Sequence, residues 1–153
     1  MTINNTCIHS ILIYKVEDVI ELIKDSSGLV DVKADSDIVN DLRITRDDFH
    51  DLMQLYAMKI SVNMNDYLWY FHTSEESGPI NLGGLIFPPP YKRVERISLT
   101  PSILLDFANR DKWELHYPEH RLMSRRYDII TNQIIIIGFV ICLIIWIIYR
   151  LTD

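Results

Sequence analysis

The sequence predicts a mainly α-helical protein, in which a small helical bundle is followed by one C-terminal transmembrane helix. Residues 129–149 contain no charged residue, and about 20 mostly apolar residues suffice to cross a bilayer about 30 Å thick. In several segments before this run, apolar residues recur at spacings of three and four, which is the period of one helix face. The residues before the run are numerous enough for one compact core.

The apolar run is interpreted as a membrane anchor rather than as a buried core helix. Apolar side chains cover all its faces, and a domain of this size cannot enclose such a helix. Polar residues 131–133 near its start are expected to hydrogen-bond a partner helix or to meet water and headgroups. We expect the anchor to include Ile134, Gly138, Leu143, Trp146 and Tyr149.

Flanking charge predicts which way the anchor is inserted. Only Arg150 follows the run, and the side with more cations usually stays in the cytoplasm. We therefore expect a single pass with the N-terminal domain in the cytoplasm. The cations that precede the run are Arg110, Lys112, Arg121, Arg125 and Arg126.

The uneven charge of the chain argues against nucleic acid as a partner. The net charge is −6, but residues 1–90 carry 6 Lys and Arg against 14 Asp and Glu, a net of −8. Residues 91–128 carry 8 against 6, a net of +2 beside the membrane. Nucleic-acid binding needs an excess of cations over the binding surface. The two cysteines, Cys7 and Cys142, are expected on different sides of the interface and hence not in a disulfide.

Four helical segments are expected before the anchor. The first runs from about Cys7 to Lys24 and ends at Ser26-Ser27-Gly28; its part from Val16 is the clearest, while residues 11–14 are alternatively a strand. An acidic loop, residues 29–40, follows. The second helix has Thr45 as its N-cap and Asp48 as a capping-box acid, and continues to about Ile60. Its expected buried face consists of Phe49, Leu52, Met53 and Tyr56.

The other two helices flank an irregular stretch. Aromatic residues 67–71 form a short helix, and residues 73–93, which are rich in Gly and Pro, form an ordered loop with room for a short strand. Thr100 is the expected N-cap of the last helix, with Pro101 at its first position. The side chains expected to face the core from this helix are Ile103, Leu104 and Phe107.

This order of helices, with its long acidic loop, resembles the plan of acyl carrier proteins. In that family the loop closes with a stretch like Asp-Leu-Gly-x-Asp-Ser-Leu, directly before helix two. Residues 37–44, Asp-Ile-Val-Asn-Asp-Leu-Arg-Ile, are similar to that stretch up to the serine. More closely, residues 41–48 and 99–105, followed by Lys112-Trp113, resemble an uncharacterised enterobacterial family of carrier-protein-like proteins.

The resemblance covers about residues 15–115 and implies an acyl-carrier-protein-like helical bundle in a Gram-negative bacterium. Together with the anchor, it predicts a location in the bacterial inner membrane. The expected parts are a carrier-like domain at 1–115 with an irregular insertion at about 73–97, a basic juxtamembrane linker at 116–128, the transmembrane helix at 129–149 and a short tail at 150–153.

The chain departs from true carriers at the residue that carries their chemistry. In carriers, a serine before helix two bears phosphopantetheine through a phosphodiester. The resemblance places Arg46 at that position and Thr45 one residue before it, and an arginine cannot form the ester. Ser36, in Ala34-Asp35-Ser36, resembles the carrier serine motif on its own, but it would start helix two about ten residues too early.

No constellation in the sequence predicts a catalytic residue, a metal or a cofactor. Asp47, Asp48 and Asp51 cluster at the start of helix two, where solvated acids are common because they favour the positive end of the helix dipole. His116 and His120 have the spacing of a zinc pair, but Pro118 between them opposes a helix. Acidic carriers dock basic partners through helix two, so the resemblance implies an interaction face at Arg43, Arg46, Asp47, Asp48 and Asp51.

The expected function is that of a membrane-tethered, non-enzymatic protein-interaction module that binds the lipid bilayer and a further protein. Loss of the serine and gain of an anchor both favour it. One alternative is a working acyl or peptidyl carrier that uses Ser36 or another hydroxyl and delivers acyl groups to membrane transferases. Another alternative is an immunity or regulatory protein for a toxin or a membrane enzyme.

Overall fold

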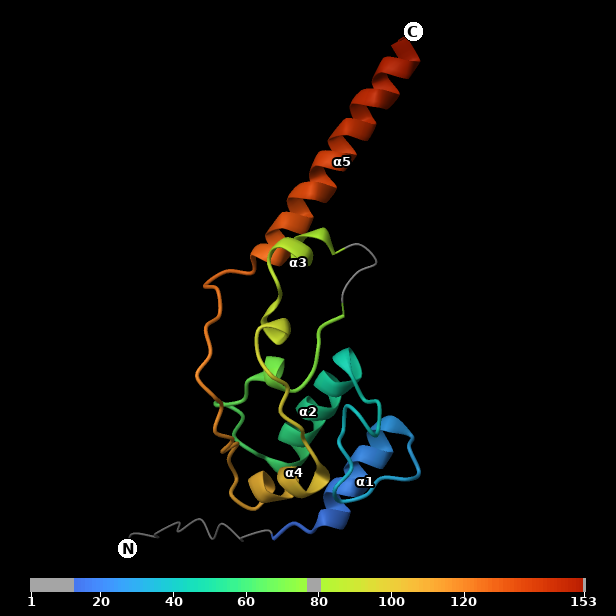
Figure 1. Ribbon diagram of the computed structural model, residues 1–153. Coiled ribbons are helices and arrows are strands. Elements are labelled where there is room, and N and C mark those ends of the chain that lie inside the picture. The colour runs from blue at the N-terminus through green and yellow to red at the C-terminus, as the bar shows by residue number, and fades with distance from the viewer. Residues whose placement is uncertain (1–12, 77–80, 153) are drawn as a thin grey trace, which may run out of the picture. The chain divides into compact units, whose positions relative to one another are not determined.

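The computed structural model describes residues 13–76 and 81–152, and within them it confirms a mainly helical fold. No strand occurs in these residues; one isolated bridge joins Asn63 and Lys112. The short strand considered for residues 73–93 is absent from the described part of that stretch, which contains two short helices instead. The elements are α1 (Val16–Ser27), α2 (Arg46–Ile60), η1 (Trp69–Phe71), α3 (Leu82–Ile86), η2 (Pro90–Lys92), α4 (Pro101–Ala108) and α5 (Tyr127–Thr152) (Figure 1).

The chain divides into two compact units. The first consists of Met1–Tyr67 and Ser98–Leu115, and the second of Leu68–Ile97 and His116–Asp153. The aromatic segment 67–71, predicted as one short helix, straddles this division, and only Trp69–Phe71 forms a 3₁₀ turn.

In the first unit, α1, α2 and α4 enclose the core. The predicted face of α2 is confirmed, because Phe49, Leu52, Met53 and Tyr56 are all buried. On α4, Leu104 and Phe107 are buried as predicted, whereas Ile103 is only half-buried. The period of apolar residues therefore located the inner faces correctly.

The C-terminal end of α1 and the N-terminal end of α4 follow local rules. Gly28 ends α1 in the left-handed conformation (φ 72°), and its N–H donates to the Lys24 carbonyl at 2.8 Å. Thr100 caps α4 by accepting the Ile103 N–H at 3.3 Å, as predicted. The predicted start of the first helix near Cys7 lies outside the described residues, and the described helix begins only at Val16.

Two buried aromatic side chains connect segments of this core that are far apart in the sequence. Trp113 is fully buried and packs against Tyr67 and Phe107, with ring centroids 4.8 Å and 4.5 Å away. Tyr56 is also fully buried, and its hydroxyl donates to the Leu104 carbonyl at 2.6 Å. Burial raises the pKa of Tyr56 far above its usual range, so the hydroxyl keeps its proton.

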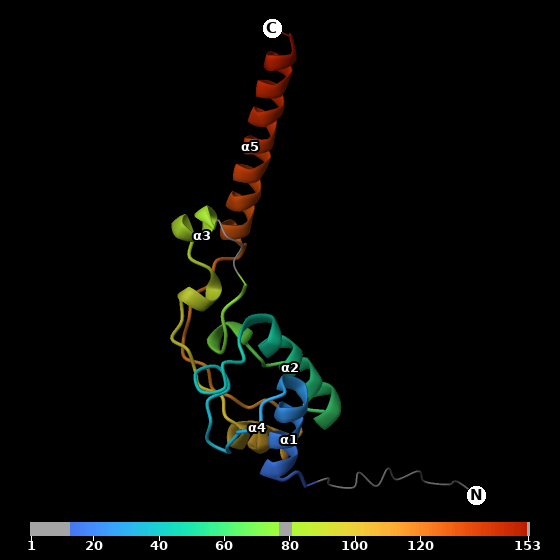
Figure 2. The same cartoon turned by 90° about the vertical axis from the view of Figure 1, so that its right-hand side faces the viewer.

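The second unit carries the long C-terminal helix. α5 has 26 residues and is long and apolar enough to cross a membrane, and no part of its most apolar 18-residue window is buried in the protein. It begins two residues before and ends three residues after the predicted anchor at 129–149. α3 lies beside the first turns of α5 in both views (Figure 1, Figure 2).

Candidate functional site

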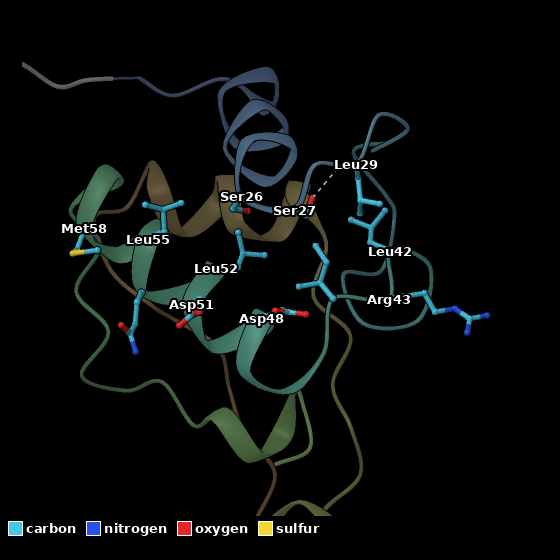
Figure 3. Close-up of a pocket in the computed structure, with 12 residues that line it drawn as sticks. Ser26, Ser27, Leu29, Leu42, Arg43, Asp48, Asp51, Leu52, Leu55 and Met58 are labelled. Atoms are coloured by element: carbon cyan, nitrogen blue, oxygen red, sulfur yellow. Dashed lines mark hydrogen bonds between the residues drawn. The ribbon is translucent and has the colours of Figure 1, made fainter. Parts of the chain in front are cut away.

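A cavity beside the predicted site lies in the first unit, between the end of α1 and one face of α2 (Figure 3). It is an open groove with a volume of about 650 Å³, within the usual range for ligand pockets. Its walls come from α1 and the turn after it, from the loop before α2, and from α2 itself. The lining residues are Ser26, Ser27, Leu29, Leu42, Arg43, Ile44, Asp48, Asp51, Leu52, Gln54, Leu55 and Met58.

The groove has an apolar floor and an acidic edge. Leu52 and Ile44 are buried beneath it, while Met58 is 71% exposed at one end. Asp48 and Asp51 project from α2 along the edge, and the Arg43 side chain points away from both carboxylates (Figure 3). Such a surface suits an apolar side chain flanked by cations.

The structure brings together three of the five residues of the predicted interaction face. Arg43, Asp48 and Asp51 line the groove, whereas Arg46 and Asp47 are exposed but do not line it. Within the described residues, no group of three His, Cys, Asp or Glu side chains is arranged to hold a metal ion. The acids of α2 are thus surface groups along a hydrophobic groove.

The head of α2 has an unusual backbone. Arg46, the first helical residue, has φ 56°, and Arg43 has φ 60°. Residues other than glycine seldom adopt this left-handed conformation, which costs roughly 1–2 kcal/mol. Thr45 occupies the N-cap position as predicted, but its side chain accepts no capping hydrogen bond. The prediction that the Thr45 hydroxyl is engaged as a cap is therefore wrong, and we attribute this to the left-handed Arg46, which opens the first turn.

Ser36 lies on the loop before α2, away from the helix head. Its side chain is half-buried, and its hydroxyl accepts the Lys33 N–H at 3.3 Å. It faces a separate shallow hollow of about 350 Å³, which Asp31, Asp35 and Asp41 also line. Lys33 and Leu42 complete the lining of this hollow.

The next residue, Asp37, holds this loop in place. Its carboxylate accepts the Val39 and Asn40 N–H groups, both at 2.9 Å, and the Ser98 hydroxyl. The Ile38 N–H donates to the Leu99 carbonyl at 2.9 Å, which joins the loop to the segment before α4. The acidic loop is thus an ordered part of the first unit.

Of the two histidines with the spacing of a zinc pair, His120 contacts other groups and His116 lies on the surface. The His120 ring nitrogens lie 2.8 Å from the Tyr70 hydroxyl and 2.9 Å from the Pro118 carbonyl oxygen. His116 is exposed.

Sequence reasoning missed a buried histidine in the second unit. His72 is 1% exposed, and its Nδ1 and Nε2 lie 3.0 Å from the Ile97 carbonyl oxygen and 2.9 Å from the Tyr117 hydroxyl. Burial, with a smaller effect of the Arg96 charge, lowers the pKa of His72 to about 4, against the hydrogen bond to Ile97. His72 directly follows an aromatic run, but nothing in the sequence points to partners 25 and 45 residues away.

A family model described as "Protein of unknown function (DUF1493)" matches residues 8–116. The chain belongs to this family. The match includes the groove, Arg46 and Ser36, and it ends before α5. No curated protein and no solved structure matches the chain.

The DUF1493 match thus coincides with the part of the chain that carries the candidate site. All twelve residues that line the groove lie inside it, and so does the loop anchored by Asp37. In this member of the family, the long helix α5 follows the matched region.

Proposed function

We propose that this DUF1493 protein is a membrane-tethered, non-enzymatic interaction module, whose degenerate acyl-carrier-like domain faces the cytoplasm from a bacterial inner membrane. The single observation that carries the proposal is Arg46. It is the first residue of α2, where the resemblance to carriers places their serine, and it has no hydroxyl to esterify. A carrier-like order of helices without the attachment serine favours recognition over acyl transfer.

The groove beside α2 supports a protein as the partner. An apolar floor bordered by Asp48 and Asp51 matches a segment that presents an apolar side chain between Lys or Arg residues. Because Arg43 points away, the edge stays acidic (Figure 3). The partner is therefore a basic protein surface, either on a membrane enzyme or on a toxin that the module restrains.

α5 supports the tether. Its 26 residues exceed the about 20 that a bilayer requires, and its side chains from Gln133 to Thr152 are exposed to the surroundings. The excess of cations before the helix favours the cytoplasmic side for both units.

The first test is the intact mass of the full-length protein purified from its own membranes. A mass equal to that of the sequence, allowing for removal of Met1, supports the proposal. An added phosphopantetheine would overturn it in favour of a working carrier. The Ser36→Ala variant then decides whether Ser36 carries the arm.

The second test addresses the groove. A photo-crosslinking residue at Gln54, on the groove edge, is expected to trap a partner in intact cells. Asp48→Lys combined with Asp51→Lys should abolish that adduct, because the acidic edge becomes basic. The matched control reverses two exposed acids of α1, Glu17 and Glu21, and should retain it. An adduct that survives reversal of the groove acids, or that both pairs of reversals remove, contradicts the assigned face.

A further inference from the structure

The short helix α3 packs against the beginning of α5. We call the contact between Gly83 and Asn132 the Gly83–Asn132 clasp. Gly83 of α3 is buried against the first turn of α5. A Cβ atom at Gly83 would collide with the Asp128 carbonyl and lie 3.1 Å from the backbone nitrogen of Asn132. Only glycine lets the two backbones approach this closely. Figure 1 and Figure 2 both show α3 alongside this end of the helix.

The same contact satisfies a polar side chain of the apolar helix. The Asn132 Oδ1 accepts the Gly83 N–H at 2.7 Å, and its Nδ2 donates to the Asn81 Oδ1 at 2.8 Å. That Asn81 oxygen also accepts the Gly84 N–H at 2.7 Å. The sequence predicted a partner helix, water or headgroups for residues 131–133, but Asn132 finds its partners in its own chain.

A cluster of ion pairs makes a second contact at the beginning of α5. The Arg126 guanidinium donates to both Glu75 oxygens at 2.7 Å and 2.6 Å, and to the Asp128 oxygens at 3.0 Å and 2.7 Å. These charge-assisted pairs join the segment before α3 to the first turn of α5. The start of α5 is therefore held from two sides.

Beside the beginning of α5, helix α3 exposes apolar side chains. Leu82, Leu85 and Ile86 are 46%, 80% and 62% exposed. At 1.5 Å per residue, residues 129–149 rise about 32 Å, which is close to the hydrocarbon thickness of about 30 Å. When residues 129–149 cross the bilayer, the hydrocarbon begins in the first turns of α5, beside Gly83.

We infer that α3 is a second membrane contact, which inserts Leu82, Leu85 and Ile86 into the lipid interface and is held there by the Gly83–Asn132 clasp. The inference rests on the proposed membrane anchoring of α5. Its partner is the bilayer itself, because the exposed apolar side chains of α3 belong to a helix that lies beside the first turns of α5. The tether is thus a two-point contact that sets how the second unit meets the membrane.

The test uses the full chain with Cys7→Ser and Cys142→Ala, reconstituted into vesicles of phosphatidylcholine and phosphatidylglycerol. Single cysteines at Leu85, Ile141 and Glu119 carry an environment-sensitive fluorophore. Lipids with a spin label near the headgroup or deep in the acyl chain serve as quenchers. We expect shallow quenching and a blue-shifted emission at Leu85, deep quenching at Ile141, and neither at Glu119.

Two substitutions test the clasp. Gly83→Ala adds the colliding Cβ, and Asn132→Ala removes two hydrogen bonds without adding volume, so both should weaken quenching at Leu85 and leave Ile141 unchanged. The matched control is Gly138→Ala, on α5, where a Cβ meets nothing within 4 Å; it should change neither probe.

The outcomes separate the inference from the proposed anchor. Quenching at Ile141 without quenching at Leu85 overturns the inference and leaves the anchor standing. Absence of quenching at Ile141 overturns the anchor, and the inference with it. Unchanged Leu85 quenching in both clasp variants overturns the role of the Gly83–Asn132 contact.

Discussion

Acidification is expected to destabilise the second unit through His72. The Nδ1–H of this ring donates to the Ile97 carbonyl, and its Nε2 accepts from the Tyr117 hydroxyl, which in turn accepts the Leu68 N–H at 3.1 Å. This arrangement needs a neutral ring, since protonation turns the acceptor Nε2 into a donor. Burial accordingly lowers the pKa of His72 to about 4, from 6.5 in an exposed ring.

The direction and size of the effect follow from proton linkage. Between pH 6.5 and 4 the unfolded chain binds a proton at His72 and the folded chain does not, so the stability present above pH 6.5 is lost as the pH falls. At about 1.4 kcal/mol per pKa unit, the loss is about 2 kcal/mol at pH 5 and about 3 kcal/mol at pH 4.

The assay compares the native chain with His72→Gln, a variant that keeps polar atoms but does not titrate. Hydrogen exchange of the amides at 71–73, measured in detergent micelles from pH 7 to pH 4, reports local unfolding after correction for intrinsic rates. The opening free energy should fall with pH in the native chain more steeply than in the variant. NMR of the ring supplies the pKa directly. A His72 pKa near 6.5, or parallel pH profiles of the two chains, would refute the reasoning.

Three further predictions concern the first unit and are measured by denaturant unfolding. Tyr56→Phe should cost about 1–3 kcal/mol, because the buried Leu104 carbonyl loses its donor. Trp113→Ala should cost about 3–5 kcal/mol, because it empties the space of the largest fully buried side chain. Gly28→Ala should cost about 1 kcal/mol through its left-handed backbone alone, since no atom lies within 4 Å of the added Cβ. The control Gly138→Ala should cost nothing comparable, and equal losses at both glycines would contradict a backbone origin.

Local rules predicted much of the first unit. The apolar period located the buried face of α2, and Thr100-Pro101 located the start of α4, because both signals act over a few neighbouring residues. At Thr45 the same rules placed the N-cap correctly but failed for its hydroxyl. The left-handed Arg46 after it is not encoded by any residue preference, since arginine disfavours that conformation.

Elements that depend on distant partners escaped prediction. α3, Leu-Gly-Gly-Leu-Ile, contains two poor helix formers, and their N–H groups donate to the Asn132 and Asn81 side chains, which helps to form the helix. The groove beside α2 is equally non-local, because its walls come from three separate segments. The predicted interaction face contained Arg43, Asp48 and Asp51 of the groove but none of its apolar side chains.

By itself, the sequence determined the helical class and an apolar segment long enough to cross a bilayer. Each of these depends on residue type or on a short period, and so is independent of how the chain packs. Only the tertiary structure decided that Asn132 bonds to α3, that His72 is buried and neutral, and that Arg43 leaves the groove edge acidic. These properties depend on the approach of residues far apart in the chain, where desolvation and hydrogen-bond geometry determine what each side chain does.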